Sequence, residues 1–322
     1  MGSKLLDYFR GDDLAASVWQ SKYAQPGEET PDDMHRRMAR EFARIEKKYQ
    51  EKEGKLLAIG GELSKYGYER TWLDEERIYK LFKDFKYIVP QGSVMSQLGS
   101  KSIGSLSNCF VIGTPQDSYG GIFQKDEEMA HLMKRRGGVG IDISTLRPNG
   151  TFVSNAARNS TGAVSFMHRY SNTTREVSQS GRRGALMISM DINHPDIMEF
   201  IKIKKDLSQV TGANISIKIN NEFMKAVEND GDYILRFPCT QDLSYFSQDY
   251  LDVKYNELMY LEDHKRNNEV FYIKKIKAKE YWDEIIKSAH GYAEPGIIFV
   301  DNHHNYSPDG VYEQYKGVTT NP

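Results

Sequence analysis

The chain has 322 residues, with 43 lysines and arginines against 45 aspartates and glutamates, and a formal net charge of -2 at pH 7. This balance argues against a protein whose main partner is bulk nucleic acid or an anionic membrane. No apolar run approaches the roughly 20 residues that span a bilayer, and the first residues lack the apolar core of a signal peptide. We therefore expect a cytoplasmic protein, with neither nucleic acid nor membrane as partner and with one large domain or two ordinary ones.

The first 75 residues predict a mainly helical region. At 30–33 the sequence TPDD combines a capping hydroxyl, a proline at the first helical position and two acids at the positive end of the helix dipole. Apolar residues then recur at helical spacing: Met34, Met38, Phe42 and Ile45. We expect this region (1–75) to be followed by a second unit that spans 76–322.

Five short apolar runs predict strands in the second unit. They are CFVI (109–112), VGIDI (139–143), ALMISM (185–190), ISIKI (215–219) and IIFV (297–300). Continuous apolar runs are typical of strands that are buried on both faces, and helical stretches between them imply parallel connections. The runs therefore predict an α/β sheet or barrel. The polar, tyrosine-rich segment 240–275 is expected to form an excursion from this sheet.

Three loops near these strands are rich in glycine and arginine. They contain Gly137 and Gly138 after two arginines, the stretch 144–162 around Arg147, and SQSGRRGA (178–185). Taken singly, each loop is more often a solvated turn than a site. Because ligands gather at the carboxyl ends of parallel strands, we expect all three loops at that end. There they would form one or two sites for phosphorylated small molecules.

The cysteines and histidines carry less information by themselves. Two cysteines cannot form a disulfide scaffold for a chain of this length, and Cys239 is expected to be a small core residue. The role of Cys109 depends on its context. His303 and His304 stand beside Asp301, but no third ligand has suitable spacing, so we expect a polar loop and no metal site.

Six motifs in a fixed order then resemble one family. They are SLSNCFVI, QDSYGGIF, KRRGGVGIDISTLRPNG, SQSGRRGALM, HPDIMEFIKIK and GANISIKIN. From about Val89 to Pro322 the chain is similar to the large catalytic subunit of aerobic-type ribonucleotide reductases, whose fold is a ten-stranded α/β barrel built from two five-stranded halves. The resemblance implies that the five runs, with at most one further strand, form the first half of such a barrel.

The resemblance assigns part of the substrate site. Cys109 matches the cysteine that reduces the ribose together with a second cysteine and so becomes a disulfide. Ser107 matches a residue near the substrate phosphates, and Ser93 is a second hydroxyl of this kind. Gly137 and Gly138 match positions at which the backbone approaches the substrate.

An allosteric site is also implied by the resemblance, with ATP or deoxynucleoside triphosphates as effectors. Asp117, with Ser118 beside it, matches the acid that holds the effector ribose. Arg147 matches an arginine that binds the effector phosphate, and the loop after it resembles a first specificity loop. In a second such loop, Gln179 and Arg183 would link the effector base to the substrate base.

The last six residues, GVTTNP (317–322), predict a strand and the start of a turn. In the family the corresponding strand leads into Asn-Pro-Cys-x-Glu, whose cysteine becomes the thiyl radical and whose glutamate is a general base. Asn321 matches the asparagine that holds the ribose. We expect a second polypeptide that carries the C-terminal half-barrel and the radical cysteine, produced by a split gene or an intein boundary, although a truncation would give the same end.

Further partners are implied by the resemblance. They are a second copy of the large subunit, a thioredoxin- or glutaredoxin-type reductant, and either adenosylcobalamin or a metal-radical small subunit as the radical source. Two other functions remain open. A non-catalytic nucleotide-binding regulator would bind deoxynucleotides without any turnover, and another radical enzyme of the same barrel fold, such as a glycyl-radical enzyme, would bind none of them.

Overall fold

The computed structural model describes residues 3–153, 155–177, 184–239, 257–260, 270–308 and 320. Its contacts divide the chain into two compact units, Met1–Asn108 and Cys109–Pro322, and we describe each unit separately. No helix in the described part of the chain is long and apolar enough to cross a membrane. The division falls later than the boundary expected after residue 75, for a reason that lies in the core of the first unit.

The first unit is helical. Its elements are α1 (Ser3–Tyr8), α2 (Asp13–Lys22), α3 (Pro31–Ala58), α4 (Lys65–Glu69), α5 (Glu75–Phe82), the 3-10 turn η1 (Lys83–Phe85) and α6 (Gly92–Gln97). Ile78 and Phe82 of α5 are buried in the same cluster as Met34 and Met38 of α3, and Leu98 joins them. Residues beyond 75 therefore complete this core, which is why the first unit extends to Asn108.

The predicted helix start at residues 30–33 is confirmed at α3. Thr30 and Asp33 form a capping box, in which the Asp33 carboxylate accepts from the Thr30 N–H at 3.0 Å. Such a box satisfies N–H groups that have no partner within the helix. Met34 and Met38 are fully buried, whereas Phe42 is exposed, so the apolar stripe packs only along the first part of α3.

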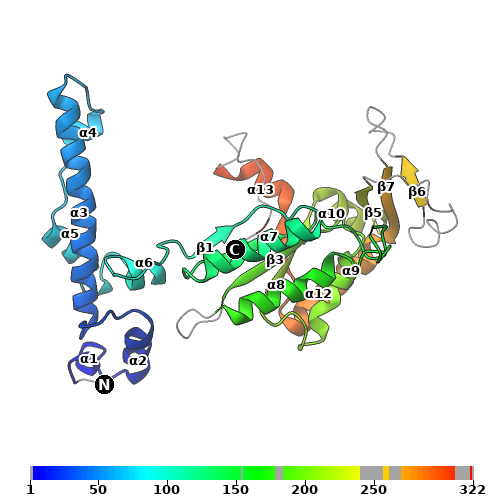
Figure 1. Cartoon of the computed structure of the whole chain (residues 1–322), viewed down its shortest axis with the longest axis horizontal. Coiled ribbons are helices and arrows are strands. Elements are labelled where there is room, and N and C mark those ends of the chain that lie inside the picture. Colours follow the sequence, from blue (N-terminus) through cyan, green and yellow to red (C-terminus); the bar gives the residue numbers. More distant parts are fainter. Residues whose placement is uncertain are drawn as a thin grey trace. The chain divides into compact units, whose positions relative to one another are not determined.

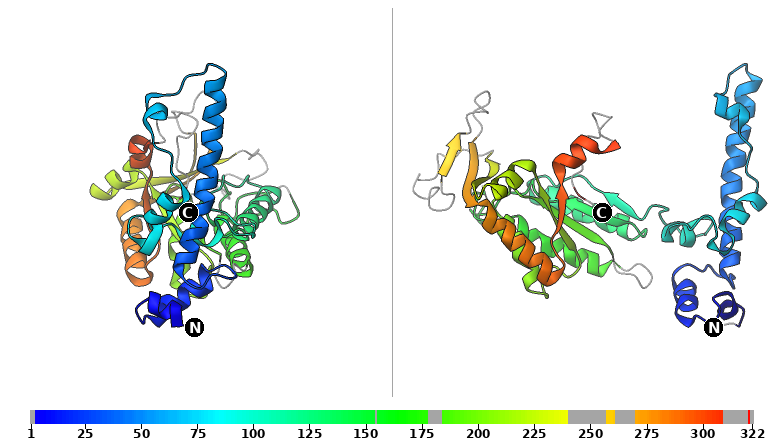
Figure 2. Two further views of the ribbon diagram at one scale, coloured as in Figure 1. Left: turned by 90° about the vertical axis from the view of Figure 1, so that its left-hand side faces the viewer. Right: turned by 180° about the vertical axis from the view of Figure 1, so that it is seen from behind.

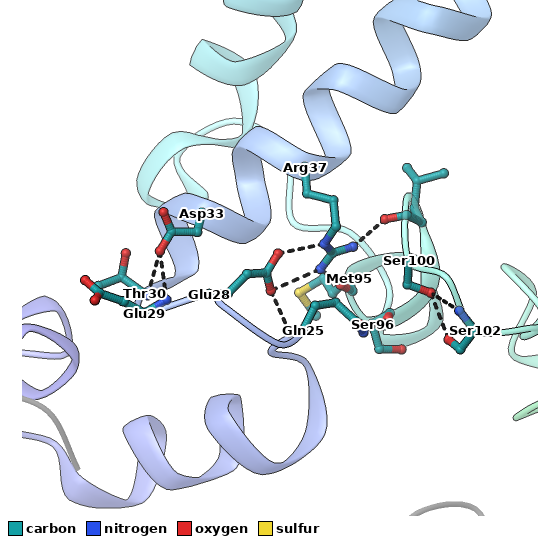
Figure 3. A network of polar contacts seen from close by, with 11 residues as sticks. Gln25, Glu28, Glu29, Thr30, Asp33, Arg37, Met95, Ser96, Ser100 and Ser102 are labelled. Carbon is teal, nitrogen blue, oxygen red and sulfur yellow. Dashed lines mark hydrogen bonds and ion pairs between the residues drawn. The ribbon is translucent and has the colours of Figure 1, made fainter.

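Arg37 of α3 holds the carboxyl end of α6 (Figure 3). Its guanidinium donates to the carbonyl oxygen of Met95 at 2.8 Å and to that of Leu98, and its Nε pairs with a Glu28 oxygen at 2.7 Å. Only 12% of the Arg37 side chain and 9% of the Glu28 side chain are exposed. A cation at this end of a helix meets carbonyl groups that lack intrahelical partners. The pair therefore stabilises a helix that is too short to persist alone.

The second unit is built on a five-stranded sheet. Its strands are β1 (Cys109–Val111), β2 (Gly138–Asp142), β3 (Leu186–Asp191), β4 (Asn214–Ile219) and β8 (Gly296–Phe299). They lie in the order β1-β2-β3-β4-β8, and every neighbouring pair is parallel. These strands coincide with the five apolar runs. The predicted fold class, the first half of an α/β barrel preceded by helices, is confirmed.

Helices cover one face of this sheet (Figure 1). They are α7 (Tyr119–Met133), α8 (Ala163–Glu176), α9 (Ile197–Lys202) with the 3-10 turn η2 (Ile203–Lys205), α10 (Asn221–Glu228) and α12 (Ala278–Tyr292). Helix α13 (Val300–Tyr306) follows β8 directly and is exposed after Asp301. Ile141, Ile188 and Ile217 face the helices and are buried in one cluster with Met167 of α8 and Phe200 of α9. Alternate residues point to the opposite face, because side chains along a strand alternate.

A second, antiparallel sheet stands at one end of this unit, apart from the parallel sheet (Figures 1 and 2). Its strands are β5 (Asp232–Cys239), β6 (Glu257–Tyr260) and β7 (Val270–Lys277), in the order β5-β7-β6. The described parts of the segment 240–275 thus lie outside the parallel sheet, as expected. Cys239 packs against Phe237 and Tyr272, in agreement with its interpretation as a small packing residue.

Candidate functional site

The parallel sheet separates the candidate residues into two groups at opposite edges. Gly137 and Gly138 lie at the start of β2, and Ala185 directly precedes β3, so both belong to the amino edge. Arg147 follows β2 and lies beyond the carboxyl edge. The expectation that all three glycine- and arginine-rich loops share the carboxyl edge is therefore wrong, because loops before and after a strand lie at its opposite ends. Two separate sites are favoured over one.

A cavity of about 240 Å³ lies at the carboxyl edge, between the segments that follow β1 and β2. It combines carboxylate, guanidinium, amide and hydroxyl groups with two aromatic rings, Tyr119 and Phe166. Such a mixture suits a small ligand with a flat ring and several polar groups. The lining residues are Asp117, Ser118, Tyr119, Ile122, Leu146, Arg147, Val153, Asn155, Asn159, Ser160, Thr161 and Phe166.

Asp117 and Arg147 meet at the wall of this cavity. Arg147 Nε pairs with Asp117 Oδ2 at 2.7 Å, and the Arg147 N–H donates to Asp117 Oδ1 at 3.1 Å. The guanidinium also donates to the carbonyl oxygens of Asp117 at 3.2 Å and of Phe152 at 2.9 Å. Charge-assisted bonds of this kind are short and directional. The structure therefore brings the two expected effector residues together and uses them to join the loops that follow β1 and β2.

Helix α7 starts at the same cavity. Ser118 is its N-cap, and the Ser118 hydroxyl oxygen accepts from the Gly121 N–H at 3.1 Å. A side chain at position 121 would collide with the Gln116 carbonyl oxygen, because a Cβ there would lie 2.6 Å from it. Tyr119 stacks on Phe123 with ring centroids 6.0 Å apart. The positive end of the α7 dipole and an aromatic surface thus border the cavity.

The amino edge carries Cys109. Its thiol is exposed, and in the sheet register Cys109 pairs with Gly138 of β2. Gly137 is required for packing, since a Cβ at this position would lie 2.7 Å from the Phe110 ring. Cys109 and the two glycines are therefore neighbours, and the backbone at position 137 already has one structural reason to be glycine.

Ser93 and Ser107 belong to the first unit. The Ser93 N–H donates to Asn108 Oδ1 at 3.2 Å, its hydroxyl donates to the same oxygen, and Asn108 Nδ2 donates to Gln91 Oε1 at 2.6 Å. Ser93 is buried, so its hydroxyl fixes the start of α6 to the segment that enters β1. Ser107 is exposed, and its N–H donates to Ser105 Oγ at 3.0 Å. Asn108, which the sequence interpretation left out, is thus the anchor of this segment.

A second cavity, of about 320 Å³, lies at the amino edge of β3 and β4. It is bounded by the end of α8 on one side and by the residues that precede β4 on the other. Its lining residues are Thr174, Arg175, Gly184, Ala185, Leu186, Met187, Thr211, Gly212 and Asn214. The cavity thus adjoins the point at which the chain re-enters the described structure after residue 183. Gln179, Arg183 and Asn321 lie outside the described residues, so their roles stay predictions.

The sheet face opposite the helices carries a buried ion network. Lys218 Nζ lies 2.6 Å from Asp142 Oδ2 and 3.8 Å from Asp191 Oδ2, so one ammonium group bridges three neighbouring strands. Burial raises the pKa of Asp191, while the Lys218 charge opposes that rise. A buried cation shared by two carboxylates fixes the register of β2, β3 and β4 at their carboxyl ends.

His194 connects the end of β3 to the loop that follows β2. The Asp196 N–H donates to His194 Nδ1 at 3.1 Å, so Nδ1 is the acceptor and Nε2 carries the proton that is donated to the Leu146 carbonyl oxygen at 2.8 Å. Burial lowers the pKa of His194 to about 4, although the hydrogen bond to Leu146 and the charges of Asp191, Asp142 and Asp117 oppose this. The folded unit therefore holds a neutral imidazole.

Because His194 is neutral in the folded protein, we expect the protein to lose stability in acid. The pKa of His194 is about 4 in the folded protein, compared with 6.5 in its ordinary environment. The contribution of the neutral imidazole to the free energy of unfolding is therefore complete above pH 6.5. It falls by about 3 kcal/mol as the pH drops towards 4. We expect His194→Gln to flatten the dependence of the unfolding free energy on pH, measured by urea denaturation between pH 4 and 7.5. The raised pKa of Asp191 has the opposite effect on the pH dependence of stability. Because Asp191 is present in both the wild type and His194→Gln, it does not affect their comparison.

The matched control is His131→Gln, since His131 is exposed and its ring pairs with Glu127, at 3.5 Å, on the surface of α7. This control should leave the pH dependence of the wild-type protein unchanged. Equal pH dependence in His194→Gln and the wild type would contradict the assignment of a buried neutral imidazole.

No cluster of three or more metal-ligating side chains occurs among the described residues. His303 and His304 lie on α13, and the Asp301 carboxylate on the same helix accepts from the Asn221 N–H at 2.6 Å. Asp301 thus connects α13 to the start of α10.

The fold and the two ends of the strands define a class: a parallel half-barrel with a polar cavity at the carboxyl ends and an exposed cysteine at the amino ends. Residues 107–314 match the family model of the ribonucleotide reductase barrel domain. The chain belongs to this family.

Individual relatives agree. The vitamin B12-dependent ribonucleoside-diphosphate reductase of Thermoplasma acidophilum is 34% identical over 222 residues, which cover 68% of this chain and 25% of that protein. The enzyme of the same name from Mycobacterium tuberculosis is 29% identical over 244 residues, 75% of this chain and 30% of that protein. The ribonucleoside-diphosphate reductase large subunit of Monkeypox virus is 30% identical over 202 residues, 61% of this chain and 25% of that protein. The chain thus spans about a quarter to three tenths of these relatives.

Proposed function

We propose that this chain forms the effector-binding part and the first half of the substrate-binding barrel of a ribonucleotide reductase large subunit. The observation that carries this proposal is the placement of Asp117 with Arg147 and of Cys109 with Gly138 at opposite ends of the same two strands. A reductase with allosteric control needs two nucleotide sites that are close but do not overlap. In this proposal, β1 and β2 provide residues for both nucleotide sites, at their opposite ends.

The cavity at the carboxyl edge is the proposed effector site, with ATP or a deoxynucleoside triphosphate as ligand. The Asp117 carboxylate would accept from a ribose hydroxyl, and Arg147 with the start of α7 would favour the phosphates. Tyr119 and Phe166 offer ring faces to a base. Ser118, which caps α7, would keep the helix start in place. Gln179 and Arg183 remain the residues proposed to connect effector and substrate bases.

The amino edge is the proposed substrate site, with a ribonucleoside diphosphate as substrate, as the names of the relatives indicate. Cys109 and a second cysteine would supply two electrons: their thiols become a disulfide, the 2′-hydroxyl leaves as water, and the product is a deoxyribonucleotide. The segment of Ser93 and Ser107 would contact the phosphates, and Asn321 the ribose. A thioredoxin- or glutaredoxin-type protein would return the disulfide to two thiols.

The reaction also requires a radical cysteine, a general base and the second reducing cysteine, which we propose lie in the remaining half of the barrel. Strands β1 and β8 are the two outermost strands of the parallel sheet in the described structure. An outermost strand presents unpaired backbone groups to which further strands can add. Two radical sources agree with the relatives, namely adenosylcobalamin and a metal-radical small subunit. Adding each separately to the assembled enzyme would distinguish them by product formation.

A homodimer is a further part of the proposal. Tyr119 and Phe123 are exposed and stacked on α7, and Arg169 lies over the Phe123 ring at 4.4 Å. Paired aromatic and cationic surface of this kind suits a self-complementary contact. Light scattering with and without effector would measure the mass of the assembly.

Equilibrium binding of dATP, dTTP and dGTP to the purified chain tests the proposed function. We expect at least one of them to bind, and Asp117→Ala to weaken that binding by about tenfold or more, since a charged hydrogen-bond partner is lost. Absence of binding by all three would contradict the proposal and favour another radical enzyme of the barrel fold. Binding without turnover, once the other half-barrel of a relative is supplied, would favour a non-catalytic regulator.

A further inference from the structure

Much of the wall of the effector cavity belongs to the segment 149–163, which is the last part of the connection between β2 and α8 and is called the effector loop below. Five of the cavity-lining residues belong to the part of this loop from 153 to 161. The loop folds back on itself: the Gly150 N–H donates to the Ser160 carbonyl oxygen at 2.7 Å, and the Val153 N–H to the Arg158 carbonyl oxygen at 2.8 Å. The shape of the cavity therefore depends on how the two ends of the loop are held.

A single carboxylate holds both ends. The Asn149 N–H, where the loop departs, lies 3.1 and 3.0 Å from the two oxygens of Asp196, and the Ala163 N–H, where it returns, lies 3.2 Å from Asp196 Oδ2. Asp196 belongs to the turn between β3 and α9, so it is a neighbour of the loop in space and not in sequence. At α8 it also faces the positive end of the helix dipole.

The packing around this carboxylate is tight. Gly162 has a φ of +83°, and a Cβ there would lie 2.7 Å from Asp196 Oδ2 and 2.7 Å from Asn149 Cβ. Asp196 is itself held, because its N–H donates to His194 Nδ1, whose ring donates to the carbonyl oxygen of Leu146. His194 thus connects Asp196 to Leu146, three residues before the loop.

We propose that Asp196 is a positioning residue that holds the effector loop in its nucleotide-binding shape, although it does not line the cavity. The inference rests on the proposed function of this cavity as an effector site. With the loop ends fixed beforehand, a nucleotide binds without having to order the loop, and this preorganisation strengthens binding. The contribution is the same for every base, because Asp196 is not among the residues that line the cavity.

The test compares Asp196→Ala and Asp196→Asn with the wild-type chain. For Asp196→Ala we expect the dissociation constants of dATP, dTTP and dGTP to rise by one common factor, about tenfold to a hundredfold, since two charge-assisted bonds are lost. Asp196→Asn, which keeps one carbonyl oxygen as acceptor, should give a smaller rise. Hydrogen exchange of the Asn149 and Ala163 amides in the nucleotide-free protein should accelerate by about tenfold or more in Asp196→Ala.

Asp206→Ala is the matched control. Like Asp196, Asp206 accepts a hydrogen bond from a backbone N–H group, in this case that of Ser208 at 2.9 Å. Asp206 is exposed, and its hydrogen bonds among the described residues do not reach the effector loop. This variant should keep the wild-type dissociation constants and the wild-type exchange of both amides.

Dissociation constants within about twofold of wild type for Asp196→Ala, or a change for one base only, would overturn the proposal. Unchanged amide exchange would overturn it as well. A wild-type chain that binds none of the three nucleotides would instead overturn the proposed function. In that case, the exchange rates would still decide whether Asp196 holds the loop, because they are measured without ligand.

Discussion

Replacement of Cys109 by serine is expected to abolish ribonucleotide reduction by the assembled enzyme, with a loss of about a thousandfold or more in turnover. A hydroxyl group cannot form the disulfide that accounts for the two electrons delivered to the ribose. Because Cys109 lies at the amino edge and the effector cavity at the carboxyl edge, deoxynucleotide binding should be unchanged. Product formation and equilibrium binding, measured on the same preparation, separate the two effects.

Cys239→Ser is the matched control for this experiment. Cys239 is the other free cysteine of the chain and packs against Phe237 and Tyr272 in the antiparallel sheet. It should retain turnover close to that of the wild type. Substantial turnover by Cys109→Ser would show that Cys109 is not a reducing cysteine, and would remove the main chemical role proposed for this chain.

Arg37→Met should lower the free energy of unfolding of the chain by about 3 to 5 kcal/mol at neutral pH. The substitution leaves Glu28 buried without its charged partner, and the Met95 and Leu98 carbonyl oxygens lose their donor. Chemical denaturation monitored by the fluorescence of Trp19, which lies in the core of the first unit, would measure the effect.

Arg44→Met provides the comparison, since Arg44 pairs with Glu41 at 2.8 Å but leaves 64% of its side chain exposed. Exposed pairs of this kind contribute little, so this variant should lose no more than about 0.5 kcal/mol. A double variant, Arg37→Met with Glu28→Leu, should recover part of the stability because no buried charge remains. A loss below about 1 kcal/mol in Arg37→Met would contradict the structural role of the pair.

The strands and the helix start at Thr30 could be predicted from the sequence because their signals are local. Each of the five apolar runs became a strand of the parallel sheet, and the capping box at Thr30 and Asp33 formed as expected. The edge at which each loop lies was only partly predicted. Gly137 and Arg147 are ten residues apart in the sequence, yet they lie at opposite ends of β2 because one precedes the strand and the other follows it.

Residues that act through long-range contacts were missed for the same reason. Asp196 was visible only as part of the motif HPDI, and nothing local indicates that its carboxylate reaches Asn149 and Ala163. Asn108 was passed over between Ser107 and Cys109, although it anchors the buried Ser93. Such roles depend on which elements become neighbours in the fold, and local sequence patterns do not specify this.

Helices α7 and α8 both contribute residues of their first turns to the effector cavity, and the two helices lie side by side on the sheet (Figure 1). Both end towards the amino ends of the strands. With 14 residues, α8 is about 21 Å long, so a tilt of about 3° at its start displaces its far end by about 1 Å. That far end includes Thr174 and Arg175, which border the second cavity. Two rigid helices thus run along the length of the strands. A change in conformation at an occupied effector cavity would be transmitted along these helices without movement of any strand.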